Sequence, residues 1–360
     1  MNVTLLSKYS RLGASSRLRS LQYLPELAAA GIRVTPLPLF DDAYLRRLYG
    51  GRGRAVGAVA RRYLARALHL QRAFGSDLFW IEKEALPYFP WWVEQLLRPA
   101  GTPYVVDYDD AIFHNYDNSR HALVRTLLGR KIDCVMAGAV TVTCGNRYLA
   151  ARANQAGARD IRHIPTVVDA ARYTPLPDAG NLRPVIGWIG SPSTQKYVLE
   201  LSAVFERLHQ AHGIQLVLVG ARPEVAKQFE AVPVDVLPWT EDTEAHHVAS
   251  FDIGIMPLTD NPWERGKCGY KLIQYMACAK PVVASPVGVN VEIVEGWDCG
   301  LLAEGDDQWF VALDRLLSQS DARVEFGRRG RLAVETHYSL HAQAPNLADI
   351  LHNAAAKKVG

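Results

Sequence analysis

Short apolar runs alternate with longer amphipathic stretches along this chain, a pattern that is typical of a parallel α/β fold. In the first half the runs predict strands at residues 2–6, 32–37, 78–81, 104–106, 139–142 and 161–164. In the second half they predict strands at residues 185–189, 214–219, 234–237, 253–256, 282–284 and 300–303. Helices between such strands indicate right-handed crossovers within mostly parallel sheets.

Two sets of strands in 360 residues indicate two domains of ordinary size. Residues 166–169, followed by the proline- and glycine-bearing residues 175–181, separate the two sets and are the predicted linker. The expected divisions are a first domain over 1–168, a second over 169–338 and a terminal segment over 339–360. The terminal segment has a helical pattern and is expected to pack back toward the first domain.

The first amphipathic stretch predicts a helix over residues 17–30. Ser15 or Ser16 is the expected N-cap, and Gly31 is expected to end the helix.

The cysteine content and the N-terminus bear on the compartment. The five cysteines form no C-x-x-C pair, which argues against a disulfide framework or a zinc site and favours the cytoplasm. The apolar run at the N-terminus is too short for a signal peptide. No stretch approaches the ~18–20 apolar residues that a spanning helix needs.

The strongest chemical signal is the stretch 267–285, which predicts a loop, a helix, a tight turn and a buried strand. A glycine at the helix start lets a ligand approach the backbone, where free N–H groups and the helix dipole favour a diphosphate. The candidate nucleotide and diphosphate contacts here are Lys267, Gly269, Tyr270, Lys271 and Gln274. A surface helix with incidental lysines is the alternative interpretation.

Two other loops follow predicted strands, at the edge of a parallel sheet where ligands bind. The strand 185–189 is followed by Gly190, Ser191 and Lys196, which are candidates for the donor diphosphate. A plain turn with a solvated lysine would leave the same pattern. The first strand is followed by a loop with the candidate residues Gly13, Ser15, Ser16 and Arg17, although a capped helix start explains it equally well.

Three carboxylates lie together after the predicted strand 104–106, where they repel one another. Asp109 and Asp110 are the first candidates for catalysis. His114 is a further candidate, and an ordinary loop histidine is the alternative interpretation. A carboxylate beside a reacting centre can stabilise positive charge that develops in a transition state. Capping of the strand end by aspartate is the structural alternative, and orienting an acceptor hydroxyl is another chemical one.

These motifs resemble retaining glycosyltransferases of family 4, the group 1 glycosyltransferases, which have the GT-B fold. Gly269, the pair Met276–Ala277 and the run Pro281–Ser285 match the family's loop, helix and strand. The family's two glutamates, eight positions apart, fall on Gly266 and Gln274, of which only the glutamine can still hydrogen-bond a ribose. The family's arginine and lysine that hold the leaving diphosphate fall on Ser191 and Lys196.

The resemblance implies two Rossmann-like domains that face each other across a cleft, with the acceptor on the first and the nucleotide sugar on the second. It implies a loop that turns Gly13 toward the donor phosphates, with Ser15, Ser16 and Arg17 on the acceptor side. It also places Asp109 beside the anomeric carbon, where a carboxylate can stabilise an oxocarbenium-like transition state. It implies transfer from a nucleoside diphosphate sugar, with UDP or GDP favoured, to a glycan, lipid-linked or small-molecule acceptor in bacterial surface polysaccharide or glycoconjugate synthesis. Retention of configuration, no metal and no further cofactor are also implied. A sugar-nucleotide epimerase of the same fold and a non-catalytic nucleotide-sugar-binding subunit stay open.

Residues 43–76 contain no acid but carry an arginine series with apolar residues interleaved: Arg46, Arg47, Arg52, Arg54, Arg61, Arg62, Arg66 and Arg72. A basic amphipathic segment can lie on an anionic membrane, so peripheral attachment to the inner face is expected. A solvated helix of the first domain is the alternative. Nucleic acid is not an expected partner, because binding it needs more than this segment.

Overall fold

The computed structural model describes residues 1–49, 56–72, 75–99, 101–175 and 181–357. The chain divides into two compact units. Unit 1 comprises Met1–Thr166, Gly266–Cys268 and Gln343–Gly360, and unit 2 comprises Val167–Arg265 and Gly269–Ala342. The expected divisions at 168/169 and 338/339 lie within a few residues of two changes of unit, whereas the short return of Gly266–Cys268 to unit 1 was not expected.

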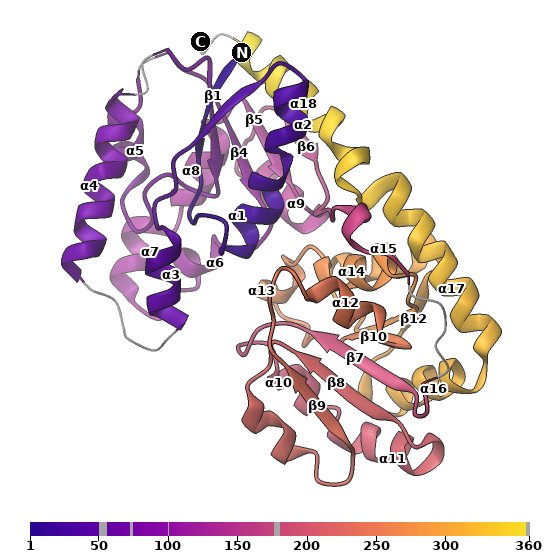
Figure 1. Ribbon diagram of the computed structural model, residues 1–360. Coiled ribbons are helices and arrows are strands. Elements are labelled where there is room, and N and C mark those ends of the chain that lie inside the picture. The colour runs from indigo at the N-terminus through magenta and orange to yellow at the C-terminus, as the bar shows by residue number, and fades with distance from the viewer. Residues whose placement is uncertain (50–55, 73–74, 100, 176–180, 358–360) are drawn as a thin grey trace. The chain divides into compact units, whose positions relative to one another are not determined.

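Each unit is built on a parallel sheet, as Figure 1 shows. The strands described in unit 1 have the order β2-β1-β3-β4-β5-β6: β1 (Asn2–Leu6), β2 (Arg33–Pro36), β3 (Leu78–Glu82), β4 (Tyr104–Tyr108), β5 (Thr141–Cys144) and β6 (Ile161–His163). Those described in unit 2 have the order β12-β11-β10-β7-β8-β9: β7 (Val185–Ile189), β8 (Gln215–Val219), β9 (Val234–Leu237), β10 (Ile253–Met256), β11 (Val282–Ala284) and β12 (Gly300–Leu302). The predicted two-domain α/β class is confirmed.

Helices cover both faces of each sheet, because successive strand residues point to opposite sides. In β7, Val185 and Ile189 join one apolar cluster, while Ile186 and Trp188 join the other. The helices described in unit 1 are α1 (Ala14–Arg19), η1 (Leu21–Tyr23), α2 (Leu24–Ala29), α3 (Asp42–Tyr49), α4 (Val56–Arg72), α5 (Trp91–Leu97), α6 (His114–Asp117), α7 (Ala122–Leu128), α8 (Lys131–Ala137) and α9 (Arg147–Gln155).

The remaining helices begin after Thr166 in the chain. They are η2 (Ala170–Arg172), α10 (Lys196–Leu199), α11 (Ser202–His212), η3 (Pro223–Gln228), α12 (Glu244–Ala249), α13 (Pro262–Arg265), α14 (Tyr270–Ala277), α15 (Val289–Trp297), α16 (Gly305–Ser318), α17 (Ser320–Ala333), η4 (Val334–Tyr338) and α18 (Leu340–Ala356). Helix α18 enters unit 1 at Gln343, and Lys357, just beyond it, pairs with Asp160 in that unit. None of the described helices has both the length and the apolar character that a membrane span requires.

The strand order fixes where side chains meet. In unit 1 the chain reverses direction across the sheet between β1 and β3, and in unit 2 between β7 and β10. Loops at the carboxyl ends of such neighbouring strands diverge and leave room for a ligand. At this point of unit 2, the Tyr275 hydroxyl accepts from the Ile189 N–H and donates to the Ile255 carbonyl, both at 3.1 Å.

The prediction of one helix over 17–30 is wrong. The stretch folds as α1, η1 and α2, and Pro25 lies in the first turn of α2. Proline has no N–H to donate and its ring clashes with the preceding turn, so it destabilises a helix interior and favours the first turn, where α2 begins. The predicted caps are wrong as well, since Gly13 is the N-cap and both serines lie inside α1. Gly31, with φ of +76°, does follow the end of α2.

The arginine series in residues 43–76 is not uniformly on the surface. Arg66 is 2% exposed, and it donates to the Ser7 carbonyl at 2.6 Å and to the Leu37 carbonyl at 2.8 Å. Arg62 pairs with Asp41. Arg52 and Arg54 lie outside the described residues, while Arg61 is exposed on α4. The segment is therefore partly structural, and Arg66 is corrected from a surface residue to a buried one.

Candidate functional site

In unit 2 the predicted diphosphate residues gather at the carboxyl end of β7. The Nζ of Lys271, on the first turn of α14, lies 3.0 Å from the position a Cβ on Gly190 would take and 4.7 Å from the centroid of the Trp188 ring. A side chain at 190 would also meet the Trp188 ring at 2.3 Å, so glycine is required. The structure therefore brings a lysine ammonium to the end of β7, where the strand order of this unit reverses.

The loop after Gly190 is polar and open. Ser191 is exposed, its hydroxyl lies 2.8 Å from that of Ser193, and its carbonyl accepts from the N–H of Thr194. Lys196 is the first residue of α10 and is exposed, with its ammonium 4.8 Å from the centroid of the Tyr197 ring. The adjacent Tyr197 hydroxyl donates to the buried carboxylate of Glu264 at 2.7 Å, and this hydrogen bond holds the base of α10.

The start of α14 has the backbone that the sequence predicted. Gly269 is its N-cap with φ of +66°, and a Cβ there would lie 2.6 Å from Ile293. The left-handed conformation and the close packing both require glycine. Tyr270, the next residue, is half-buried beside Tyr173.

Gln274 does not face a ligand, contrary to the expectation of a ribose contact. It is 2% exposed, and its amide nitrogen donates to the Tyr173 hydroxyl at 3.0 Å and to Glu244 at 3.3 Å. Glu244 also accepts from Trp239, so this carboxylate is the centre of a buried network. Burial, reinforced by Tyr270 and Glu244, raises the pKa of Tyr173.

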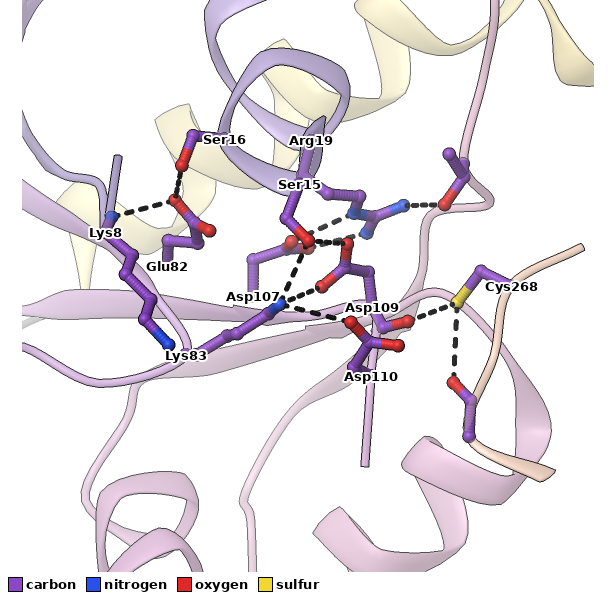
Figure 2. Close-up of polar contacts among 12 residues, drawn as sticks. Lys8, Ser15, Ser16, Arg19, Glu82, Lys83, Asp107, Asp109, Asp110 and Cys268 are labelled. Carbon is purple, nitrogen blue, oxygen red and sulfur yellow. Dashed lines mark hydrogen bonds and ion pairs between the residues drawn. The ribbon is translucent and has the colours of Figure 1, made fainter. Parts of the chain in front are cut away.

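In unit 1 the carboxylates after β4 are held by a lysine that the sequence did not single out. Figure 2 shows Lys83 lying between Asp109 and Asp110. Its Nζ is 2.8 Å from Asp109 Oδ1, 3.5 Å from Asp110 Oδ2 and 3.0 Å from the Ser15 hydroxyl. Ser15 in turn donates to Asp109 Oδ2 at 2.7 Å.

The two aspartates differ in exposure and acidity. The Asp109 side chain is 12% exposed and that of Asp110 is 29% exposed. Burial acts to raise the pKa of Asp109, but Lys83 and Arg19 outweigh it and hold that pKa below its usual value. Burial and the neighbouring Asp109 raise the pKa of Asp110. Asp109 is therefore the firmly ionised partner, and Asp110 is the more open one.

The predicted acceptor-side residues have structural partners. Ser16 is buried and donates to Glu82 at 2.6 Å, and Arg17, 3% exposed, donates to the Arg11 carbonyl at 3.3 Å. Neither side chain faces an acceptor in this conformation, and only Ser15 reaches the aspartates. Gly13 is required by packing, because a Cβ there would meet the Tyr9 side chain at 2.4 Å.

His114 is engaged on both ring nitrogens. Nδ1 lies 2.9 Å from Asp117, and Nε2 lies 2.9 Å from the Tyr148 hydroxyl. The side chain is 13% exposed, so the ring is fixed within unit 1 rather than directed at a ligand.

The segment Gly266–Cys268 packs against the same loop after β4. The Asn146 side-chain amide donates to the carbonyls of Gly266 and Lys267, both at 2.9 Å, and the Cys268 thiol donates to the Asp109 carbonyl at 3.2 Å. A Cβ on Gly266 would lie 2.5 Å from the Cβ of Ala111 and 2.7 Å from its backbone nitrogen. The absence of the family's glutamate at 266 therefore has a steric cause. Lys267 is half-buried, and its charge acts on Asp110.

A second ion pair lies behind the aspartates. Arg19 donates to both oxygens of Asp107, at 2.9 and 2.6 Å, and to the Ile164 carbonyl at 2.8 Å. Thr143 adds a hydrogen bond to Asp107 at 2.6 Å. This pair connects α1, β4 and the residue after β6, and it holds in place the end of the strand that Asp109 follows.

Lys83 and Arg19 are the functional candidates that sequence reasoning missed. Lys83 follows β3 directly, so the rule that ligands bind beyond strand ends could have found it. Arg19 carried no comparable signal, because its partner Asp107 is 88 residues away.

Comparison with known proteins assigns the second half of the chain. Residues 183–319 match the family model described as glycosyl transferases group 1. No curated protein matches the sequence.

Several solved structures resemble the whole chain at low sequence identity. The sucrose-phosphate synthase (tll1590) from Thermosynechococcus elongatus is 17% identical with a TM-score of 0.72, and 98% of each chain is covered. Anabaena Alr3699/HepE in complex with UDP and glucose is 17% identical with a TM-score of 0.71, covering 98% of this chain and 100% of that one. WaaG, a glycosyltransferase involved in lipopolysaccharide biosynthesis, is 15% identical with a TM-score of 0.67, covering 98% and 99%.

These findings confirm the GT-B fold and the enzyme class. The two parallel sheets match those neighbours, and the second half carries a group 1 glycosyltransferase domain. Family 4, retention of configuration and independence of metal stay predictions, as do the roles of the individual site residues.

Proposed function

We propose that this chain, with its group 1 glycosyltransferase domain over residues 183–319, moves a sugar from a nucleoside diphosphate sugar to a glycan, lipid-linked or small-molecule acceptor. Transfer would retain the anomeric configuration and need no metal, and its products would be bacterial surface polysaccharide or glycoconjugates. A UDP- or GDP-sugar is the proposed donor, and the neighbour in complex with UDP and glucose supports UDP.

The observation that carries the proposal is the approach of Lys271 to Gly190 at the carboxyl end of β7. A cation at the carboxyl end of a strand, at this point of a doubly wound sheet, suits a diphosphate. When the glycosidic bond to the diphosphate breaks, negative charge grows on the leaving group, and Lys271 and Lys196 would stabilise it. Asp109 would meet the positive charge that grows on the sugar.

Lys196→Ala is expected to weaken binding of UDP or GDP while the melting temperature stays unchanged, since Lys196 is exposed and begins a short helix. Isothermal titration calorimetry with both nucleotides measures the effect, and loss of one charge-assisted contact predicts about a tenfold fall in affinity. Lys280→Ala is the matched control, because Lys280 precedes β11 and so lies at the amino ends of the strands, away from the carboxyl end of β7. Equal affinities for the parent and Lys196→Ala would remove Lys196 from the site.

A non-catalytic nucleotide-sugar-binding subunit is the second candidate. Two observations favour it: Gly266 has no room for a carboxylate, and Gln274 is turned into the protein. Incubation of the protein with a donor that it binds, followed by product analysis, separates the candidates. A glycoside indicates transfer, a free epimer indicates epimerisation, and unchanged donor in the presence of varied acceptors indicates binding alone.

Membrane attachment through residues 43–76 is part of the proposal, with the protein on the inner face of the membrane. On α4, Val56 is 81% exposed and Leu64 is 62% exposed, beside the exposed Arg61. Helix α5 packs beside α4 and exposes Trp92 at 59% and Leu96 at 77% (Figure 1). Aromatic and basic side chains together are typical of surfaces that lie at a lipid interface.

The protein is expected to float with anionic vesicles and to detach as salt is raised, because exposed charges are screened. Arg61→Glu should weaken this binding, since it reverses a charge on α4 without removing a described contact. Arg183→Glu makes the same change on an exposed residue of unit 2 and serves as control. Equal, negligible flotation with neutral and anionic vesicles would rule out the attachment and favour a soluble acceptor.

A further inference from the structure

We infer that Lys83 is a positioning residue of the transfer site: its buried ammonium holds the carboxylates of Asp109 and Asp110 in place so that Asp110 can contact the substrate. The inference rests on the proposed function for the identity of that substrate. It assigns a role to a residue that neither the motifs nor the family model single out.

The backbone at Lys83 is strained. Lys83 has φ of +65°, a left-handed conformation that is unfavourable for a residue with a side chain. It follows β3 directly, and its N–H donates to the Asp107 carbonyl at 2.9 Å. This conformation turns the chain at the strand end and directs the side chain toward the loop after β4 (Figure 2). Such strain persists where the surroundings enforce it, and it is common at functional sites.

The contacts of Lys83 exceed those of a single structural ion pair. The Lys83 side chain is 8% exposed. Its ammonium contacts Ser15 on α1 and two consecutive carboxylates after β4. One of these, Asp109, is nearly enclosed and has its second oxygen occupied by Ser15. The other, Asp110, is 29% exposed, which leaves part of its carboxylate open to a substrate hydroxyl.

Other charged groups surround Lys83, Asp109 and Asp110, but several of them are paired with other residues. Arg19 is engaged by Asp107, and Glu84 accepts from Lys131 at 2.5 Å. Glu82 accepts from Ser16 and from the N–H of Lys8. The groups that act on Lys83 and the two aspartates from neighbouring elements are Lys8, Ser15, Arg19, Glu82, Lys267 and Cys268. Lys83 is the cation in direct contact with both Asp109 and Asp110.

The electrostatic consequence has a definite sign. Burial alone would lower the pKa of Lys83, but Asp109 and Asp110 raise it, so the ammonium stays charged. The same contact lowers the pKa of Asp109 and opposes the rise in the pKa of Asp110. Removing the ammonium leaves two adjacent carboxylates in a partly buried place, and the pKa of at least one must rise.

Lys83→Met tests the inference through the pH dependence of turnover at saturating donor. We expect the acid limb to move to higher pH by about one to two units and turnover at neutral pH to fall by about 10²-fold, with donor affinity within a few-fold of the parent. Lys83→Arg keeps the charge and should keep the acid limb. Adding Asp110→Asn to Lys83→Met removes the repulsion and should return the acid limb toward that of the parent.

Lys8→Met is the matched control, since Lys8 lies beside Lys83 but forms no described ion pair with the aspartates, and the acid limb should not move. Should Lys83→Met fail to fold, Lys83→Gln replaces it. The inference is overturned if Lys83→Met or Lys83→Gln folds and its acid limb does not move. It is also overturned if the acid limb of Lys83→Arg moves as far as that of Lys83→Met.

A titration without substrate separates this inference from the proposed function. Carbon-13 NMR of the aspartate carboxyl groups should show one midpoint raised by about one unit or more in Lys83→Met relative to the parent. If the parent transfers no sugar but this shift appears, the proposed function fails and the electrostatic role of Lys83 stands. If the parent transfers sugar but the shift is absent, the role of Lys83 is wrong.

Discussion

Arg19→Met is expected to lower the free energy of unfolding by about 3–5 kcal/mol, the usual result of removing one partner of a buried ion pair. Arg19 is 3% exposed and Asp107 is 4% exposed, and the guanidinium donates to both carboxylate oxygens. Methionine fills much of the volume but leaves the carboxylate of Asp107 with the hydrogen bond from Thr143 and no cation. The loss is therefore chiefly that of an uncompensated buried charge.

Denaturant unfolding followed by circular dichroism measures this loss. Arg162→Met is the control, because the Arg162 side chain is 58% exposed in its pair with Asp160, and such surface pairs contribute about 0–1 kcal/mol. The double variant Arg19→Met, Asp107→Leu should recover part of the stability, since it removes the orphaned charge as well. A loss below about 1 kcal/mol for Arg19→Met would show that water reaches Asp107 and that the pair is not a buried one.

The fold was predictable because its signals are local. Every predicted strand is present, since a strand buried on both faces must be a short apolar run between polar turns. The helix at 17–30 was mispredicted because the helical spacing of its apolar residues continues across Pro25, where the structure starts a new helix. The serine caps failed for a different reason: Ser15 and Ser16 bond to Asp109 and Glu82, and such long-range partners are invisible in the local sequence.

The candidate site was predictable only in part, for a related reason. Asp109 directly follows a recognisable strand, and Lys271 lies in the first turn of a recognisable helix. Motif spacing could therefore identify both. The position of Lys83 after a strand was visible in the sequence, but its contact with the aspartates follows only from the pairing of β3 with β4, which places Glu82 opposite Asp107. The glycine at 266 looked like a lost carboxylate, whereas the packing against Ala111 shows that no side chain fits there. Tertiary contacts decide both cases.

Asp109→Asn is expected to reduce turnover by about 10²–10³, the effect of losing one well-placed electrostatic contact. Asp109 follows β4, its pKa is held low by Lys83 and Arg19 against the effect of burial, and it is therefore ionised at neutral pH. A carboxylate that meets positive charge developing on the sugar stabilises the transition state more than the bound donor. Asparagine keeps the size of the side chain and one acceptor for Ser15 or Lys83, but it removes the charge.

Transfer rate at saturating donor, donor affinity by calorimetry and the melting temperature must be measured together. The loss should appear in turnover, while donor affinity stays within a few-fold of the parent, because the proposed diphosphate contacts lie on Lys196 and Lys271. Asp133→Asn is the control: Asp133 lies on α8 in a half-buried pair with Arg152 on α9, so turnover should hardly change. Near-parental turnover in Asp109→Asn would exclude Asp109 from catalysis. Asp110, whose carboxylate is more exposed and whose pKa is raised, would then be the carboxylate to test.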